Sequence, residues 1–242
     1  WPHAMNASAT HDTKRGEDVR ARLNVLSELP AEWERLLRQW REINLAHKAT
    51  VGGRPAPEDD DEYLLYQTLL GAYPFDLAEY PAFIERVKAY LIKATREAKD
   101  HTNWLEPNGP YEKALLGFAD RVLQPGKDNP FLQAFLPFQR RIQHYGILNS
   151  LAQTLLKLTA PGLPDFYQGT ELWDLSLVDP DNRRPVDFER RGALLGELQA
   201  RASGHLPNLL KELLTAPEYG RVKLFLIHRA LQARRAEQEL FQ

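Results

Sequence analysis

The sequence LAQTLLKLTAPGLPDFYQGTELW, residues 151–173, contains the change of pattern on which the fold assignment depends. Its first ten residues are apolar at helical spacing, and Pro161 with Gly162 then forms a turn. The next residues predict a short aromatic strand, which ends at Gly169. We therefore expect a strand with tight turns at both ends, and alternation directs Phe166 or Tyr167 into the core.

Helical periodicity covers most of the remaining chain. The first periodic segment, 19–29, has Thr13 as a plausible N-cap and Pro30 as its stop. A second apolar stripe follows, and its aromatic residues fit a core better than a sugar platform because aliphatic residues share their face. That stripe consists of Trp33, Leu36, Leu37, Trp40 and Ile43. Further helices are expected at 62–73, 81–100, 110–123, 130–160, 190–200 and, with breaks, 206–242.

Two of the segments between these helices carry candidate features. Residues 52–57, GGRPAP, predict a flexible break. The acidic run 58–62 that follows suggests either a metal site or, as we favour, a solvated loop whose acids complement the N-terminal dipole of the helix expected from Glu62. In the loop 101–108, Trp104 stands beside amide and hydroxyl groups. It could stack on a sugar ring or anchor the loop by packing.

The doublet His11-Asp12 lies in the string ATHDTKR, residues 9–15. An imidazole N–H donor beside a carboxylate acceptor can hold the hydroxyl groups of one polar ring from two directions. The alternative is structural, with Asp12 capping the following helix and His11 partly buried.

Several long strings resemble one family. They are His3-Ala4-Met5, ATHDTKR with EDVRAR at 17–22, EYLLYQTLLG at 62–71, and ELWDLSLVDPDNRRPVD at 171–187. A His-Asp loop followed by a G-x-P-x-x-Y-x-G-x-E strand resembles the last two barrel strands of family 13 glycoside hydrolases, the α-amylase clan. The fuller strings resemble its maltooligosyltrehalose synthase family.

This resemblance implies an intramolecular transglucosylation that converts the reducing-end α-1,4 bond of a maltooligosaccharide into an α,α-1,1 bond, with no cofactor and no metal. Retention of configuration requires two carboxyl groups about 5 Å apart, a nucleophile and an acid/base. The family's strings for both precede the His-Asp loop and are missing here. The nearest imitation, GFADR at 117–121, lacks the required Arg and lies in a helical pattern. We therefore expect a fragment of the catalytic region, inactive alone, whose partner is the remainder of its own barrel.

The resemblance also implies roles for individual residues. Asp12 matches the carboxylate that stabilises the transition state, and His11 matches its sugar-binding neighbour. Lys14 and Arg15 fit binding of the rotated acceptor glucose, or else ion pairs with the acids at 17–18. The proposed substrate-binding set is completed by Trp104, Tyr167, Gln168 and Glu171. In the loop 179–185, Arg183 and Arg184 could bind sugar or, as we favour, brace the loop through carboxylates.

The expected architecture is mainly α: a helical insertion plus the last strand and helices of a (β/α)8 barrel. Residues 1–29 would form a barrel segment, 30–150 the insertion, and 151–242 the last strand and C-terminal helices. A helical cover that excludes water would help a cleaved glucose reattack before hydrolysis occurs.

Composition restricts the partners and the chemistry. The sequence has 31 Lys and Arg against 33 Asp and Glu, so it offers no basic field for nucleic acid. It contains no cysteine and no apolar run near the roughly 18 residues of a membrane span. The resemblance implies a cytoplasmic enzyme. The alternatives are a hydrolase of the same clan, a metal-dependent His-Asp phosphohydrolase and an inert helical binding module.

Overall fold

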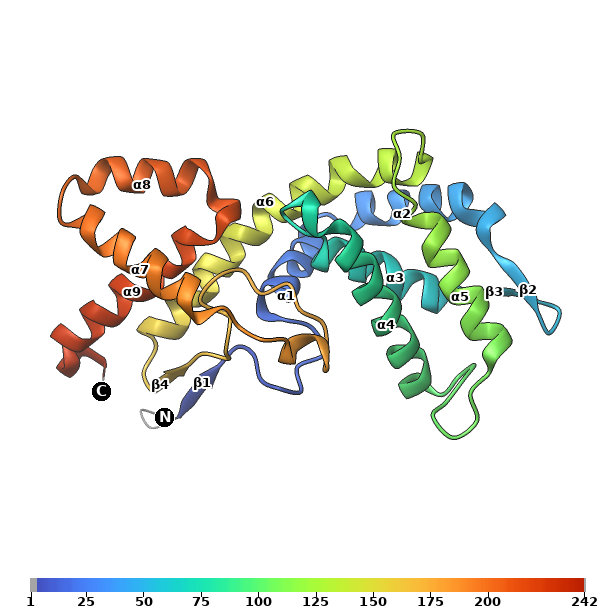
Figure 1. Ribbon diagram of the computed structural model, residues 1–242, viewed down its shortest axis with the longest axis horizontal. Coiled ribbons are helices and arrows are strands. Elements are labelled where there is room, and N and C mark those ends of the chain that lie inside the picture. The colour runs from blue at the N-terminus through green and yellow to red at the C-terminus, as the bar shows by residue number, and fades with distance from the viewer. Residues whose placement is uncertain (1–3, 242) are drawn as a thin grey trace. The chain divides into compact units, whose positions relative to one another are not determined.

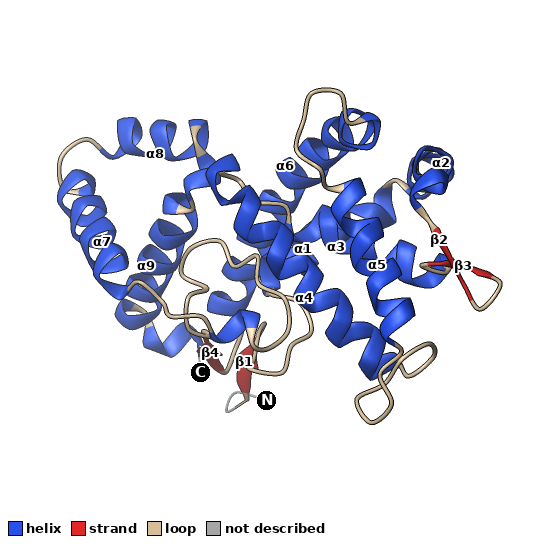
Figure 2. Cartoon of the chain, turned by 45° about the vertical axis from the view of Figure 1, so that its right-hand side comes forward, coloured by secondary structure: helices blue, strands red, loops and turns tan. Residues whose placement is uncertain are grey.

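The computed structural model describes residues 4–241, and it is mainly helical, as the sequence predicts (Figures 1 and 2). The α-helices are α1 Glu17–Asn24, α2 Pro30–Asn44, α3 Asp59–Ala72, α4 Tyr80–Ala98, α5 Gly109–Val122, α6 Pro130–Thr159, α7 Phe188–Ala202, α8 Leu206–Thr215 and α9 Arg221–Ala236. The strands are β1 Met5–Ala7, β2 Ala49–Val51, β3 Arg54–Ala56 and β4 Leu163–Asp165. Short 3-10 turns include η1 Val25–Glu28 and η4 Asp181–Arg183.

The chain divides into two compact units. One unit combines the segment up to Arg22 with the segment from Tyr145 onward, and the other is the continuous segment Leu23–His144. The first contains two motif blocks, the His-Asp string at 9–15 and the segment 162–187, and the second contains α2 to α5. Each is described separately below.

The continuous unit has an aromatic core. The Trp40 ring of α2 is completely buried, and its centroid lies 5.5 Å from that of Tyr66 and 5.4 Å from that of Phe135. Trp33 is also buried and meets Trp40 edge to face at 5.7 Å. These contacts confirm the sequence interpretation that the aromatic stripe of this helix belongs to the core.

The segment predicted as a flexible break is an ordered β-hairpin. β2 and β3 pair antiparallel, and Gly52 and Gly53 form the turn with φ of +59° and +80°. Two successive positive φ angles suit the right-handed twist of a two-residue hairpin, and glycine adopts them without a side-chain clash. The prediction counted the glycines as breakers and missed the strands because each is only three residues long.

Pro30 marks a boundary, but not the one predicted. The first helix, α1, ends at Asn24 and continues as the 3-10 turn η1, whereas Pro30 is the first residue of α2. A proline suits that place because its fixed φ is helical and its missing N–H would have no partner there.

In the other unit, β1 and β4 lie side by side as a parallel pair (Figure 1), with Met5 opposite Leu163 and Ala7 opposite Asp165. Leu163 N–H donates to the carbonyl oxygen of Ala4 at 2.8 Å. Gly162, with φ +104°, is required because a Cβ there would stand 2.4 Å from that oxygen. The strand ends before Phe166 and Tyr167, so both aromatic residues are half-buried loop residues rather than strand residues.

The C-terminal helices of this unit pack together around an apolar cluster. Its buried members come from α7, α8, α9 and the chain before them, and they are Leu172, Leu198, Leu209, Leu213, Leu224 and Phe225. The predicted helices in 190–200 and 206–242 are thus present, the second as α8 and α9 with a break between them (Figure 2).

Candidate functional site

The two motif blocks meet at one end of the parallel strand pair. The His-Asp string follows β1, and the string Phe166–Trp173 follows β4. Because β1 and β4 are parallel neighbours, their carboxyl ends share one edge, where parallel sheets usually carry their functional loops. The structure therefore brings together residues that are far apart in the sequence.

His11 and Asp12 lie in a tight turn closed by its flanking threonines. Thr10 N–H donates to Thr13 Oγ1 at 2.8 Å, and Thr13 N–H donates to the Thr10 carbonyl at 3.3 Å. Thr13 therefore closes this turn and is not the N-cap that the sequence predicted, because helix α1 begins four residues later, at Glu17. His11 is exposed and the Asp12 side chain is 72% exposed, so both are accessible to a ligand.

The turn is also held by the loop that contains η4. The amide Nδ2 of Asn182 donates to the His11 carbonyl at 2.9 Å, and the Asn182 carbonyl accepts a hydrogen bond from the Tyr167 hydroxyl at 3.1 Å. Farther along, Gly16 N–H donates to the Ser176 carbonyl at 2.8 Å. The second motif block thus contacts the first directly.

The cations after the doublet differ in their surroundings. Lys14 is exposed, with its Nζ 3.7 Å from Asp12 Oδ1. Arg15 is half-buried, and its backbone forms an isolated antiparallel bridge with Leu177. Glu17 and Asp18, the acids considered as partners for these cations, bind Lys157 and Lys223.

A buried ionic cluster surrounds the first turn of α1. It consists of Glu17, Asp18, Lys157 and Lys223, and each side chain is at most 5% exposed. Lys223 Nζ lies 2.7 Å from Glu17 Oε1 and 2.9 Å from Asp18 Oδ2, and Lys157 Nζ lies 3.5 Å from Glu17 Oε2. The two acids and two bases offset part of the cost of burying one another's charges, and the buried Arg22 also interacts electrostatically with Asp18.

The ionic cluster also fixes neighbouring backbone. Ser8, which directly follows β1, donates to Glu17 and accepts a hydrogen bond from Lys157 at 2.7 Å. Asp174 N–H donates to Asp18 Oδ2 at 2.6 Å. The ionic cluster therefore connects α1, α6 and α9 with the start of the His-Asp loop and with the second motif block.

Burial and pairing shift the pKa values of the ionic cluster in different directions. Burial raises the pKa of Asp18 above its ordinary value, against the pull of Lys223. Burial acts likewise on Glu17, but Lys223 and Lys157 together hold the pKa of this carboxyl below its ordinary value. Burial opposes the charge of Lys223, yet Asp18 and Glu17 raise its pKa overall. Burial lowers the pKa of Lys157 below its ordinary value, although Glu17 favours its charged form.

The remaining residues predicted from the second motif block have distinct surroundings. Gln168 is exposed. Glu171 pairs with Arg191 at 3.0 Å. Arg184 Nε lies 3.0 Å from Asp181 Oδ1, and such a contact braces the loop as the sequence analysis favoured. Arg183 is exposed.

Trp104 belongs to the other unit, in the loop between α4 and α5. Its side chain is 53% exposed, and the Arg96 guanidinium lies 4.8 Å from the centre of its ring. Asn103 Oδ1 accepts the N–H groups of Leu105 and Glu106 at 2.9 and 2.8 Å, which closes the loop tip. The indole therefore has an ordered, partly exposed position.

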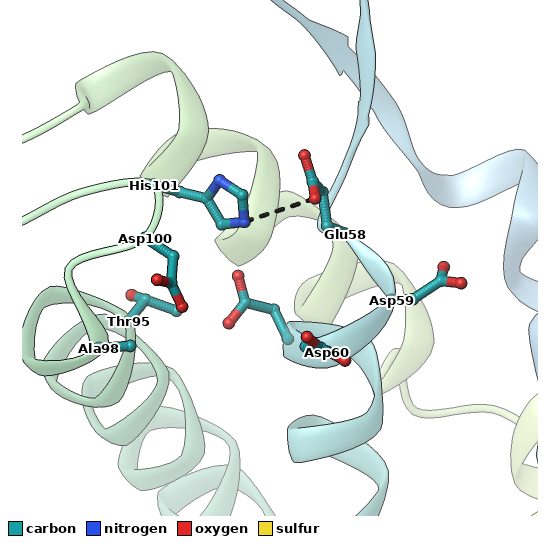
Figure 3. Close-up of a pocket in the computed structure, with 8 residues that line it drawn as sticks. Glu58, Asp59, Asp60, Thr95, Ala98, Asp100 and His101 are labelled. Atoms are coloured by element: carbon teal, nitrogen blue, oxygen red, sulfur yellow. Dashed lines mark ion pairs between the residues drawn. The ribbon is translucent and has the colours of Figure 1, made fainter.

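The acidic run of this unit lines a pocket with the end of α4 (Figure 3). His101 Nε2 lies 3.7 Å from Glu58 Oε2, and Asp61 accepts a hydrogen bond from the Tyr111 hydroxyl at 2.5 Å. Burial raises the pKa of Asp61. The acids after Glu58 were predicted as a solvated loop before a helix starting at Glu62, but they form the first turn of α3, which begins at Asp59. Glu62 is completely buried and pairs with Lys48 at 2.7 Å.

Sequence reasoning missed Asn182, Lys157 and Lys223. Both lysines leave a signal, because each is a single cation within an apolar helical segment: TLLKLTA at 154–160 and VKLFLI at 222–227. A lone charge on such a segment must be paired where it is buried. Asn182 leaves no comparable signal, since asparagine is common in turns.

Within residues 4–241, no group of three or more His, Cys, Asp or Glu side chains is arranged to hold a metal ion. In the same residues, no helix combines the length and apolarity needed to cross a membrane. His3, part of one family string, lies outside the described residues.

Known proteins of one kind match the chain. A Mycobacterium tuberculosis protein named as a maltooligosyl trehalose synthase is 41% identical over 199 residues, which are 82% of this chain and 24% of that protein. A maltooligosyl trehalose synthase crystal structure superposes with a TM-score of 0.81 at 35% identity, covering 97% of this chain and 30% of the other. The structure of the maltooligosyltrehalose synthase from Arthrobacter ramosus superposes with a TM-score of 0.77 at 36% sequence identity. The match covers 100% of this chain and 28% of the other.

No protein-family profile matches the sequence. The chain spans about a quarter of the length of the curated relatives it matches. The sequence identity, the fold and the motif strings agree. They show that this chain, which corresponds to about a quarter of its relatives' length, belongs to the maltooligosyl trehalose synthase family.

Proposed function

We propose that the chain is part of an enzyme that converts the reducing-end α-1,4 bond of maltooligosaccharides into an α,α-1,1 bond by retaining intramolecular transglucosylation. The observation that carries this proposal is the contact between the two family motifs, in which Asn182 of the second holds the His11 carbonyl of the first. These motifs follow adjacent parallel strands, as the last two strands of a family 13 barrel would require.

In this proposal Asp12 accepts hydrogen bonds from the sugar under attack and favours the oxocarbenium-like transition state. His11 donates to the same sugar, and the exposure of both side chains supports these roles. Lys14, whose ammonium lies near Asp12, and Arg15 would bind the rotated acceptor glucose.

The outer residues would contribute in different ways. Gln168 is exposed and free to reach a sugar hydroxyl. Tyr167 and Glu171 already hold Asn182 and Arg191, so they would shape the acceptor side more than bind it. Trp104 would stack a glucose ring on the indole face opposite Arg96, within a helical cover that excludes water.

The nucleophile and acid/base would come from the rest of the barrel, and without them the isolated chain would be inactive. The chain presents a surface suited to such a partner, because Leu148, Leu155 and Leu156 of α6 are 44–68% exposed. Met5 and Leu163 on β1 and β4 are similarly exposed, at 66% and 62%. We also propose a cytoplasmic location, no cofactor and no nucleic-acid partner.

A chimera tests the proposal. This chain replaces the matching segment of the Arthrobacter ramosus synthase, and the product is incubated with maltopentaose and analysed chromatographically for a non-reducing oligosaccharide. We expect that product from the chimera, none from the isolated chain, and a loss of at least about 100-fold in Asp12→Asn. Asp120→Asn is the matched control, because Asp120 sits in the GFADR string but pairs with Lys88 at the surface of α5.

Other outcomes would contradict the proposal. A folded chimera that releases only shorter reducing sugars would favour a hydrolase of the same clan. A folded chimera that gives no product from maltopentaose would contradict the assignment of maltooligosaccharides as the substrate. Activity of the isolated chain would mean that a nucleophile lies among its own residues.

A further inference from the structure

We propose that Asn182 is a positioning residue for the His11-Asp12 turn, and that Tyr167 holds Asn182 in place. The role in catalysis rests on the proposed function, whereas the positioning itself does not. The inference starts from a juxtaposition of residues 171 positions apart: Asn182 Nδ2 stands 2.9 Å from the His11 carbonyl oxygen.

The hydrogen bonds within the turn fix its shape but not its position relative to the rest of the unit. Thr10 and Thr13 bind each other through N–H, hydroxyl and carbonyl groups, and the Asp12 N–H donates to Thr10 Oγ1 at 3.3 Å. These contacts would survive a rigid movement of the whole turn. The bond from Asn182 would not, because its donor belongs to another loop, and it acts on the residue next to Asp12.

The loop that presents Asn182 is braced independently of the turn. Leu177 N–H donates to Asp181 Oδ2 at 2.7 Å, Asp181 N–H donates to the Val178 carbonyl at 3.1 Å, and Arg184 pairs with Asp181. The Tyr167 hydroxyl fastens the Asn182 carbonyl to the segment after β4 at 3.1 Å. Because these contacts hold the loop in one geometry, the loop can hold the His11 carbonyl, and with it the turn, in a defined position.

The chemistry requires an amide at this position. A backbone carbonyl only accepts hydrogen bonds, so the amide nitrogen of Asn182 must face His11. Aspartate has the same shape but offers oxygen atoms that repel that carbonyl. Asn182→Asp should therefore be at least as harmful as Asn182→Ala, whereas a purely space-filling role would make it nearly neutral.

The first test measures positioning on the chain itself by hydrogen–deuterium exchange of peptides that cover residues 8–15. We expect Asn182→Ala and Asn182→Asp to accelerate exchange in these peptides by about 10-fold, the effect of losing roughly 1.4 kcal/mol, at nearly unchanged melting temperature. Tyr167→Phe should give a smaller acceleration. The matched control is Asn149→Ala, because Asn149 Nδ2 also donates to a backbone carbonyl, that of Ala21, at 3.2 Å.

The second test measures kinetics in the chimera with maltopentaose. We expect Asn182→Asp to lower kcat by about 10- to 100-fold with little change in KM, because displacement of Asp12 weakens the transition state more than substrate binding. Asn149→Ala should leave both constants nearly unchanged.

The outcomes of the two tests are independent of each other. An inactive chimera would overturn the proposed function but leave the exchange result valid. Equal exchange in wild type, Asn182→Ala and Asn182→Asp would overturn positioning. Loss of activity through KM alone, or full retention by Asn182→Asp, would overturn the catalytic part.

Discussion

The Nζ atom of Lys223 lies 2.7 Å from Oε1 of Glu17, although 206 residues separate them and neither side chain is more than 2% exposed. This contact ties α9 to the first turn of α1 within the same unit. Desolvation of both charges is costly, so their attraction mainly offsets that cost. Removing one partner leaves the other charge buried without its partner, which is strongly destabilising even though the intact pair adds little net stability. A single substitution therefore tests the contact.

We expect Lys223→Met to lower the free energy of unfolding by roughly 3–5 kcal/mol, because Glu17 and Asp18 would lose their shared cation. Urea denaturation followed by circular dichroism measures the loss. Lys211→Met is the matched control, since Lys211 is exposed on α8, and it should change stability by less than about 0.5 kcal/mol. Equal effects of the two substitutions would contradict a buried ionic role.

Two helical glycines should respond oppositely to alanine. A Cβ on Gly146 of α6 would stand 2.5 Å from Arg22 Cγ and 2.9 Å from Arg22 Cα, so Gly146→Ala should destabilise by about 1–3 kcal/mol. Gly192 of α7 has nothing within 4 Å of its Cβ position. Gly192→Ala should therefore stabilise by about 0.5–1 kcal/mol through higher helix propensity. Chemical denaturation of both variants checks the sign, and stabilisation by Gly146→Ala would refute the close approach of these helices.

Glu112 should make the stability of its unit depend on pH. Arg96 donates to both carboxylate oxygens, at 2.8 and 2.7 Å, and this bonding with that of Thr102 lowers the pKa of Glu112 below its ordinary value of 4.5. A lowered folded-state pKa gives stability that is complete above pH 4.5 and is lost as the pH falls through the folded value.

Melting temperatures of wild type and Glu112→Gln should therefore differ at pH 7 and converge toward pH 3. Glu106→Gln, at an exposed position in the neighbouring loop, serves as the control and should follow wild type throughout. A difference that stays constant with pH would show that Glu112 acts through packing rather than charge.

Trp104 tests the proposed exclusion of water. In the chimera with maltopentaose, Trp104→Ala should raise hydrolysis relative to transglucosylation several-fold, because a glucose held less firmly is more often captured by water. Product ratios from chromatography provide the measurement. Leu105→Ala is the matched control, as Leu105 is 94% exposed in the same loop. An unchanged ratio in Trp104→Ala would remove the indole from the substrate-binding set.

The mainly helical class was predictable because helices are local. The apolar spacing of Trp33 and Trp40 predicted both the helix and its buried face, and the structure confirms both. Local signals failed where elements were short. The hairpin around Gly52 and Gly53 has three-residue strands, too few for a period-2 pattern to show.

The candidate site was predictable only in its residue types. The strings around His11 and Tyr167 pointed to one family, and the comparisons show that family. The roles of individual site residues stay predictions. No local pattern indicated that Asn182 would hold the turn, because a hydrogen bond between residues 171 positions apart is formed by the fold, not by spacing.

By itself, the sequence determined most of the helices, the presence of a strand after Pro161 and the family resemblance, because periodicity and motif strings are properties of neighbouring residues. Only the tertiary structure decided which charges pair. Glu17 and Asp18 lie close to Lys14 and Arg15 in the sequence, and the fold brings Lys157 and Lys223 to them from distant helices. The physical reason is burial: a carboxylate removed from water requires a partner that is buried with it, and packing alone determines which cation that is.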